Sequence, residues 1–148
     1  MKIYLDTSTI NKIFDDQTKA RIYLEATASL LIFSLIEKDY FELISSEVLT
    51  YENDRNPYEE RKLFVSSIIK NAKQFQKLDE KILERAKEIE KLGIRGLDAL
   101  HLACAERAGA EYFLTCDNRI IKRYKGIILV KNPVEFILNI LEEENKND

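Results

Sequence analysis

Short β-rich runs alternate with longer helical patterns along almost the whole chain, and this alternation restricts the fold more than any other feature. Parallel strands cannot be joined by a tight turn, because each crossover needs about a dozen residues or more, commonly including a helix. The alternation therefore predicts an α/β fold, a three-layer α/β/α sandwich around a central, mostly parallel sheet of about five short strands. The expected strands are 2–5, 41–44, 75–78, 112–115 and 127–130.

Helical spacing and helix-end residues predict the remaining elements. Ser45, Ser46 and Glu47 look like a helix start, and Pro133 suits the first turn of a terminal helix. Residues 1–141 are expected to form one domain, and 142–148, with four acids and one lysine, an acidic, flexible tail. The other expected helices are 18–38, 59–71, 79–92, 96–108 and 119–124.

Composition excludes several classes of protein. Cys104 and Cys116 are too few for a disulfide framework or a four-cysteine zinc site, and they indicate a reducing compartment. The net charge of −3 equals the charge of the tail, so a globally basic protein that coats nucleic acid is disfavoured. The apolar stretches are too short to cross a bilayer, and Asp6 interrupts any signal-peptide core, so we expect a cytoplasmic protein without membrane contact.

Acidic residues occur where the predicted strands stop. Asp6 and Asp117 follow the first and fourth strands, Glu47 and Glu52 lie in the helix after the second, and Asp98 begins a later helix. Ligands collect at the carboxyl ends of parallel strands, so we expect these carboxylates to share one crevice. Clustered carboxylates stay ionised only with a compensating cation, and oxygen ligands suit Mg²⁺ or Mn²⁺. Such a site can hydrolyse phosphodiester bonds.

Four motifs occur in a fixed order around these acids: DTSTI from Asp6, SEVLTYE from Ser46 to Glu52, DALHLA from Asp98, and FLTCD ending at Asp117. In these motifs the chain resembles the PIN-domain family, in particular the VapC-type ribonucleases of bacteria and archaea. The resemblance runs from Lys2 to about Leu141 and includes the segment 132–136, NPVEF.

The resemblance implies a role for each residue of the site. Asp6, Glu52, Asp98 and Asp117 would be catalytic and would hold Mg²⁺ or Mn²⁺, with Glu47 competing for the glutamate position. Glu47 and Glu52 are five residues apart, about 140° around a helix, so they do not both bind one metal directly. Thr7, Ser8 and Thr115 would support the carboxylates or the phosphate, and Arg119, Lys122 and Arg123 would hold the RNA backbone.

The function that the resemblance implies is a divalent-metal-dependent endoribonuclease, the toxin of a type II toxin–antitoxin pair. Its partners would be an RNA substrate, a small antitoxin protein and a second copy in a homodimer. Helices 18–38 and 59–71 have apolar faces wide enough for such contacts. Two alternatives remain: a non-catalytic PIN-like module that binds RNA or a partner, and a stand-alone RNA-processing nuclease.

The same residues also have structural interpretations. Asp98 and Asp117 could cap helices, the Asp6 segment could be turn chemistry, and Glu47 suits the positive end of a helix dipole. His101 is the only histidine, and its apolar neighbours favour a packed or hydrogen-bonded core residue. Phosphotransfer folds of the haloacid-dehalogenase type want an acid two residues after the first aspartate, where this chain has Ser8.

Overall fold

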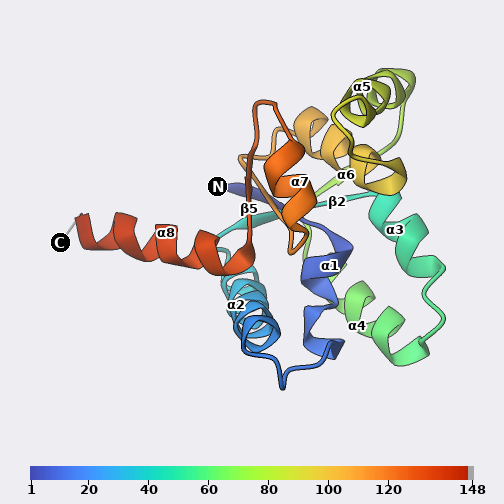
Figure 1. Ribbon diagram of the computed structural model, residues 1–148. Coiled ribbons are helices and arrows are strands. Elements are labelled where there is room, and N and C mark those ends of the chain that lie inside the picture. The colour runs from blue at the N-terminus through green and yellow to red at the C-terminus, as the bar shows by residue number, and fades with distance from the viewer. Residues whose placement is uncertain (147–148) are drawn as a thin grey trace.

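A computed structural model describes residues 1–146 and places five strands in one sheet, in the order β3-β2-β1-β4-β5 (Figure 1). All four strand pairings are parallel, which confirms the α/β prediction. The strands are close to the predicted ranges, and β2 runs two residues further than expected. Their bounds are β1 Lys2–Leu5, β2 Glu42–Ser46, β3 Gln74–Gln76, β4 Tyr112–Leu114 and β5 Leu129–Lys131.

The last three of the four residues of the central strand β1 are hydrophobic, because the strand is covered on both faces. Ile3, Tyr4 and Leu5 are completely buried, as is typical of a central strand in a parallel sheet. In register, Ile3 lies between Leu43 of β2 and Tyr112 of β4. The carboxyl end of β1 therefore opens in the middle of the sheet edge, between the ends of β2 and β4.

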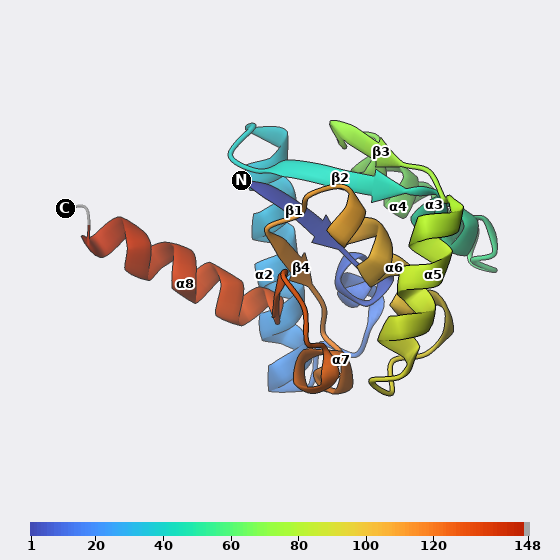
Figure 2. The same ribbon diagram turned by 90° about the horizontal axis from the view of Figure 1, so that it is seen from above.

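Helices cover both faces of the sheet, as predicted. In Figure 1, α5 and α6 lie on one side of the strands and α2 and α4 on the other, and α5 packs against α6. Helix α8 packs on α2 and then extends away from the body of the molecule (Figure 2). The bounds are α2 Ala20–Glu37, α3 Glu47–Asp54, α4 Glu59–Ile69, α5 Glu80–Glu90, α6 Gly96–Arg107, α7 Asn118–Arg123 and α8 Pro133–Lys146.

Two short helical segments follow β1 that the sequence patterns did not predict. Helix α1 (Thr7–Ile10) leads into a single 3₁₀ turn, η1 (Lys12–Phe14). Their four and three residues are too short to display a helical period, so hydrophobic spacing could not reveal them. Helix α1 forms because the side chain of Asp6 accepts a hydrogen bond from the amide of Thr9.

Part of the segment expected to be an acidic tail is helical. Helix α8 continues through residues 142–146, and the last two residues of the expected tail, 147–148, lie outside the described residues. Within the described part of the chain, none of the helices has the length and apolar character needed to cross a membrane.

Candidate active site at the carboxyl edge of the sheet

The chain changes direction across the sheet between β1 and β4. It proceeds from β1 to β2 and β3 on one side, and later returns to β4 and β5 on the other. Open α/β sheets bind ligands at such a switch point, outside the carboxyl ends of the strands. Asp6 directly follows β1, and Thr115 and Asp117 follow β4. The fold therefore brings the first and last predicted motifs to the same edge.

Asp6 is held firmly at this edge. Its carboxylate is almost fully buried, and its Oδ1 accepts hydrogen bonds from Ser8 Oγ (2.7 Å) and the Thr9 amide (3.0 Å). Burial raises the pKa of Asp6, although hydrogen bonds from Thr115, Ser8 and the Thr9 amide act in the opposite direction. Asp6 thus caps α1 through Oδ1 and is held in place at the end of β1.

The two candidate glutamates of α3 point to different places. The Oε1 atom of Glu47 accepts the backbone amide of Leu78 at 3.1 Å, on an exposed part of the surface. Glu52 instead accepts hydrogen bonds from Thr7, just after β1, and from His101 Nε2 of α6, at 3.0 Å. Burial raises the pKa of Glu52, but the bonds from His101 and Thr7 outweigh it, so the net shift is downward. Glu52 is therefore the glutamate that lies beside the Asp6 segment.

Asp98 sits in the first turn of α6 without capping it. The N-cap of α6 is Arg95, and the Asp98 carboxylate has no hydrogen-bond or ion-pair partner within residues 1–146. Burial and then the charge of Asp6, with smaller contributions from Asp117 and Glu52, raise the pKa of Asp98 to about 6. The other three acids therefore lie near enough to Asp98 to make its charged form unfavourable.

Asp117 does cap a helix, and an arginine covers it. Its Oδ1 accepts the Arg119 amide at 2.9 Å, and the Arg119 guanidinium lies 3.4 Å from Oδ1 and 3.3 Å from Oδ2. Burial raises the pKa of Asp117, but the bonds from Arg119 lower it overall. The Arg119 side chain is 76% exposed, so this ion pair is weak and easily exchanged.

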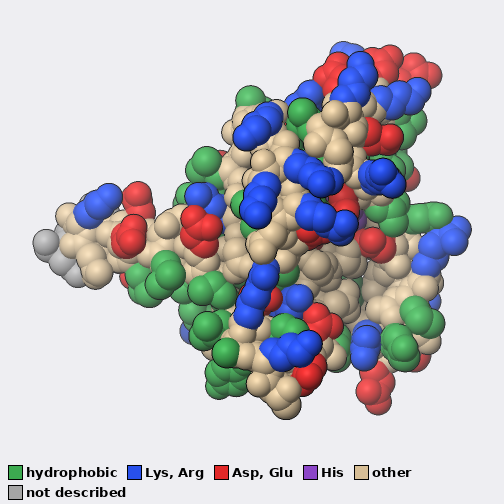
Figure 3. Space-filling view, in the orientation of Figure 1, with side chains coloured by type: hydrophobic (Ala, Val, Ile, Leu, Met, Phe, Trp, Pro, Cys, Tyr) green, Lys and Arg blue, Asp and Glu red, His purple; other side chains and the backbone are tan. Residues whose placement is uncertain are grey.

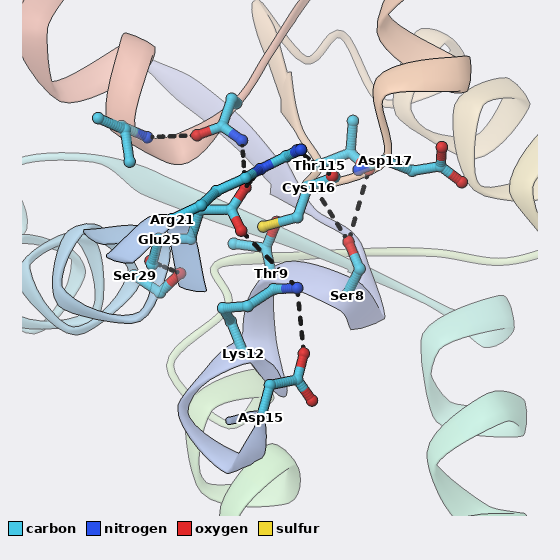
Figure 4. A network of polar contacts seen from close by, with 12 residues as sticks. Ser8, Thr9, Lys12, Asp15, Arg21, Glu25, Ser29, Thr115, Cys116 and Asp117 are labelled. Carbon is cyan, nitrogen blue, oxygen red and sulfur yellow. Dashed lines mark hydrogen bonds and ion pairs between the residues drawn. The ribbon is translucent and has the colours of Figure 1, made fainter. Parts of the chain in front are cut away.

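The loop that carries Asp117 is held from two sides (Figure 4). From the site, Ser8 Oγ accepts the Cys116 amide at 3.1 Å, and Thr115 Oγ1 accepts the Asp117 amide at 3.1 Å. From behind, Arg21 Nη2 of α2 donates to the Cys116 carbonyl at 3.2 Å and to Asn118 Oδ1 at 3.3 Å. Ser8 and Thr115 thus hold both the loop of Asp117 and the Asp6 carboxylate.

A buried glutamate orients Arg21. Glu25 Oε2 accepts Arg21 Nε at 3.2 Å and Asn132 Nδ2 at 2.6 Å, and Lys12 Nζ lies 3.9 Å from Oε1. Lys12 also pairs with Asp15 at 3.1 Å (Figure 4). One carboxylate therefore ties α2 to η1, to the start of α8 and, through Arg21, to the loop of Asp117.

A pocket of about 390 Å³ opens beside Asp98 and Asp117 and is rimmed by arginines. Figure 3 shows Lys and Arg side chains gathered around acidic ones in a hollow on this face. Arg119 and Arg123 line the pocket as the sequence suggested, whereas Lys122 is exposed and does not. Arg95 also lines it and was missed, because one arginine before a glycine carries no motif.

Two further residues of the site were missed or underestimated. His101 is a buried, hydrogen-bonded core residue, as expected, but one of its bonds goes to the Glu52 carboxylate. Its other ring nitrogen lies 2.6 Å from the Tyr4 hydroxyl, which no sequence pattern had singled out. The available signal was a tyrosine between two aliphatic residues, Ile3 and Leu5, of the expected first strand.

The four acids supply the ligands that a hard divalent cation needs, though not a finished cage. Within residues 1–146, no three acidic, histidine or cysteine side chains converge closely enough to hold a metal ion as they stand. At Asp117, Arg119 contacts both carboxylate oxygens. Asp98, by contrast, is half-buried and has no partner within residues 1–146. The charges of Asp6, Asp117 and Glu52 disfavour its ionised form, which a bound cation would stabilise. The residues therefore fit Mg²⁺ or Mn²⁺.

The profile of the PIN domain family matches residues 3–126 of the chain. The chain belongs to the PIN domain family. The match spans β1 to the residues just after α7, and so includes Asp6, Glu52, Asp98 and Asp117. PIN domains are generally nucleases that use divalent metal ions.

One solved structure gives an independent view of the fold. It is the crystal structure of VapBC2 from Rickettsia felis bound to a DNA fragment from their promoter, with 16% sequence identity and a TM-score of 0.55. The alignment covers 89% of this PIN domain chain and 98% of the matched chain. At this identity the likeness shows a shared fold. No curated protein matches the chain.

Proposed function

We propose that this PIN domain protein is a divalent-metal-dependent endoribonuclease that acts as the toxin of a type II toxin–antitoxin pair. The observation that carries the proposal is the half-buried Asp98, whose pKa is raised to about 6 by burial and by the charges of Asp6, Asp117 and Glu52. Carboxylates whose charges raise the pKa of a neighbouring carboxyl group suit a site that binds a cation. Phosphodiester hydrolysis is the chemistry that such oxygen-ligated cations perform.

Asp6, Asp98 and Asp117 would be the direct or water-mediated ligands of Mg²⁺ or Mn²⁺, and Glu52 would complete the site. When bound, the cation supplies charge stabilisation at the phosphate and lowers the pKa of a bound water. Glu52 would orient that water, because within residues 1–146 its carboxylate is bonded by Thr7 and His101 and is not paired with Lys or Arg. Ser8 and Thr115 hold the loop geometry, and Thr7 holds Glu52.

RNA would be bound along the arginine-rimmed pocket. Arg95, Arg119 and Arg123 line this pocket next to Asp98 and Asp117, and guanidinium groups bind phosphate oxygens in bidentate fashion. Arg119 would exchange its weak contact with Asp117 for a phosphate once a cation replaces it at the carboxylate. Lys122 would make a further contact from the exposed face of α7. The substrate would be RNA.

An antitoxin partner and a homodimer are part of the proposal. Helix α2 exposes a row of large apolar side chains, and Leu63 of α4 is also exposed, as on surfaces that bind other chains. The exposed residues of α2 are Tyr23, Leu24, Leu30 and Leu31. The matched structure is of a VapBC2 assembly, which supports a partner of this kind. We also infer that the protein works in the cytoplasm.

The test is cleavage of a labelled single-stranded RNA pool by the purified protein with and without Mn²⁺. Asp98→Asn keeps the shape of the side chain and removes one charge, so it should abolish metal-dependent cleavage while the fold remains. Asp54→Asn, on an exposed residue at the end of α3, is the matched control and should cut normally. Full activity of Asp98→Asn would overturn the assignment, and absence of cutting and of Mn²⁺ binding would favour a non-catalytic binding module.

A further inference from the structure

A continuous series of buried hydrogen bonds connects the start of α3 to the carboxylate of Glu52 on the same helix. Ser46 Oγ accepts the Leu49 amide at 3.1 Å and lies 2.7 Å from the Tyr4 hydroxyl. The Tyr4 hydroxyl lies 2.6 Å from His101 Nδ1, and His101 Nε2 lies 3.0 Å from Glu52 Oε1. Ser46, Tyr4 and His101 are completely buried. The series leaves α3 at its cap, passes through β1 and α6, and returns to α3.

The chemistry of the end groups gives this series one direction. An ionised carboxylate only accepts hydrogen bonds, so His101 Nε2 carries the hydrogen that points to Glu52. In the neutral ring Nδ1 is then an acceptor, and the Tyr4 hydroxyl donates to it. Burial raises the pKa of Tyr4 well above its usual value, so this hydroxyl keeps its hydrogen. Ser46 completes the series by donating to Tyr4 while it accepts from the Leu49 amide.

Packing leaves the members of the series little freedom. The Tyr4 ring stacks on Phe113 of β4, with ring centroids 5.3 Å apart and 8° between the planes. It meets the His101 ring edge-on at 5.6 Å. Buried polar networks whose donors and acceptors are all satisfied are rigid, because any rearrangement leaves a polar group without a partner. Glu52 is only partly buried, but its Oε1 receives two donors, Thr7 and His101.

We propose that Tyr4 and His101 are positioning residues that fix Oε1 of Glu52 and thereby leave Oε2 free to bind the divalent cation. Within residues 1–146, Oε2 has no hydrogen-bond or ion-pair partner. The inference rests on the proposed metal-dependent function and assigns a role to two residues that do not touch the substrate. Because Tyr4 belongs to the central strand β1, the sheet helps to orient the Glu52 carboxylate of α3.

The first experiment measures the tautomer of His101 and needs neither metal nor RNA. His101 is the only histidine in the chain, so ¹⁵N-histidine labelling gives one imidazole whose nitrogen signals need no assignment. The wild-type protein should show the neutral Nε2–H tautomer with slow hydrogen exchange. Tyr4→Phe, which removes one hydroxyl and keeps the ring, should give a mixture of tautomers. A ring in the wild type that carries its hydrogen on Nδ1 and none on Nε2 would overturn the proposed direction.

The second experiment measures Mn²⁺ affinity by calorimetry. Tyr4→Phe should weaken Mn²⁺ binding about fivefold, whereas Tyr112→Phe, a half-buried tyrosine of the neighbouring strand β4, should leave it unchanged. His101→Gln, whose amide can still donate to Glu52, should keep more affinity than His101→Leu. Urea unfolding of each variant checks that it is folded at the assay temperature.

The outcomes separate the inference from the proposed function. Unchanged Mn²⁺ affinity in folded Tyr4→Phe and His101→Leu would refute the positioning role even if the enzyme cuts RNA. If the wild-type protein binds no Mn²⁺ and cuts no RNA, the proposed function fails and the cation role of Glu52 fails with it. The tautomer measurement then still decides whether the buried series has the proposed direction.

Discussion

Asp6 and Asp117 each cap a short helix through Oδ1 and also lie close enough to Asp98 to raise its pKa. The structural and the chemical interpretations of these two residues are therefore compatible. Asp98 is different, because Arg95 occupies the N-cap of α6 and the Asp98 carboxylate has no partner in the described chain. Of the three aspartates, Asp98 is the one whose placement the helix does not require.

The two glutamates of α3 allow a matched test at the residue scale. Glu52→Gln should weaken Mn²⁺ binding about tenfold or more, because it removes a charge next to Thr7 and His101. Glu47→Gln should leave binding unchanged, since the Glu47 carboxylate accepts the Leu78 amide at the surface and, within residues 1–146, has no bond to Thr7 or His101. Calorimetric titration with Mn²⁺ measures both, and the opposite order would assign the glutamate position to Glu47.

The pKa of Asp98 predicts how the stability of the metal-free protein depends on pH. Its pKa is raised from 3.8 to about 6, so the folded state binds this proton more tightly than the unfolded chain does. Asp98 therefore contributes stability below about pH 4 that is lost as the pH rises through about 6. The asparagine side chain of Asp98→Asn does not titrate, so the variant does not lose this stability. Its free energy of unfolding relative to that of the wild type should therefore rise by about 2 kcal/mol between pH 4 and pH 7.

Urea unfolding of the metal-free proteins at several pH values checks this prediction. The comparison between the two proteins is needed because burial also raises the pKa of Asp6, while Glu52 and Asp117 are shifted downward. Asp54→Asn, an exposed change at the end of α3, is the control for the removal of one aspartate charge outside the site. A constant difference for Asp98→Asn would contradict the raised pKa.

At the scale of elements, the site depends on helices that contribute no ligand. Helix α2 holds the loop of Asp117 through Arg21, and Glu25 orients that arginine from a buried position. Helix α6 contributes both Asp98 and His101, which are three residues apart and so lie on neighbouring positions of its surface. The loop that carries Asp117 is thus determined by contacts with residues about 95 to 108 positions away.

Removal of the buried glutamate should destabilise the whole protein. Glu25→Ala leaves Lys12 and Asn132 without their buried partner, and we expect a loss of about 3 kcal/mol in the free energy of unfolding. Glu135→Ala breaks an exposed pair with Lys131 and removes a charge from the first turn of α8, and it should cost about 1 kcal/mol or less. Urea unfolding at neutral pH measures both, and equal effects would contradict the role of Glu25 as a connecting residue.

At the scale of the whole molecule, cation binding and folding stability are linked. A cation that binds only the folded state at 100 times its dissociation constant adds about 2.7 kcal/mol. For a chain of 148 residues this corresponds to a rise in melting temperature of about 5–10 °C. The wild-type protein should therefore melt higher with Mn²⁺, and Asp98→Asn should lose most of this rise. Differential scanning calorimetry tests it, and equal rises in both proteins would place the cation elsewhere.

The parallel sheet and the positions of three acids could be predicted from the sequence, because they depend on local patterns. The alternation of short apolar runs with helical spacing determined the parallel sheet, since crossover connections leave few other arrangements. The position of Asp6, Asp98 and Asp117 at strand and helix ends followed from the same patterns. Elements too short to show a period, α1 and η1, could not be predicted this way.

The tertiary structure decided which atoms of these residues are engaged. Glu52 is distinguished from Glu47 by bonds to Thr7 and His101, which are 45 and 49 residues away. The link from Tyr4 to His101 spans 97 residues. Such hydrogen bonds form only when segments far apart in the sequence are positioned to within a few tenths of an ångström. The local spacing of residues does not encode that position. The sequence by itself determined the fold and placed Asp6, Asp98 and Asp117 at strand and helix ends, and only packing decided how each carboxylate is held.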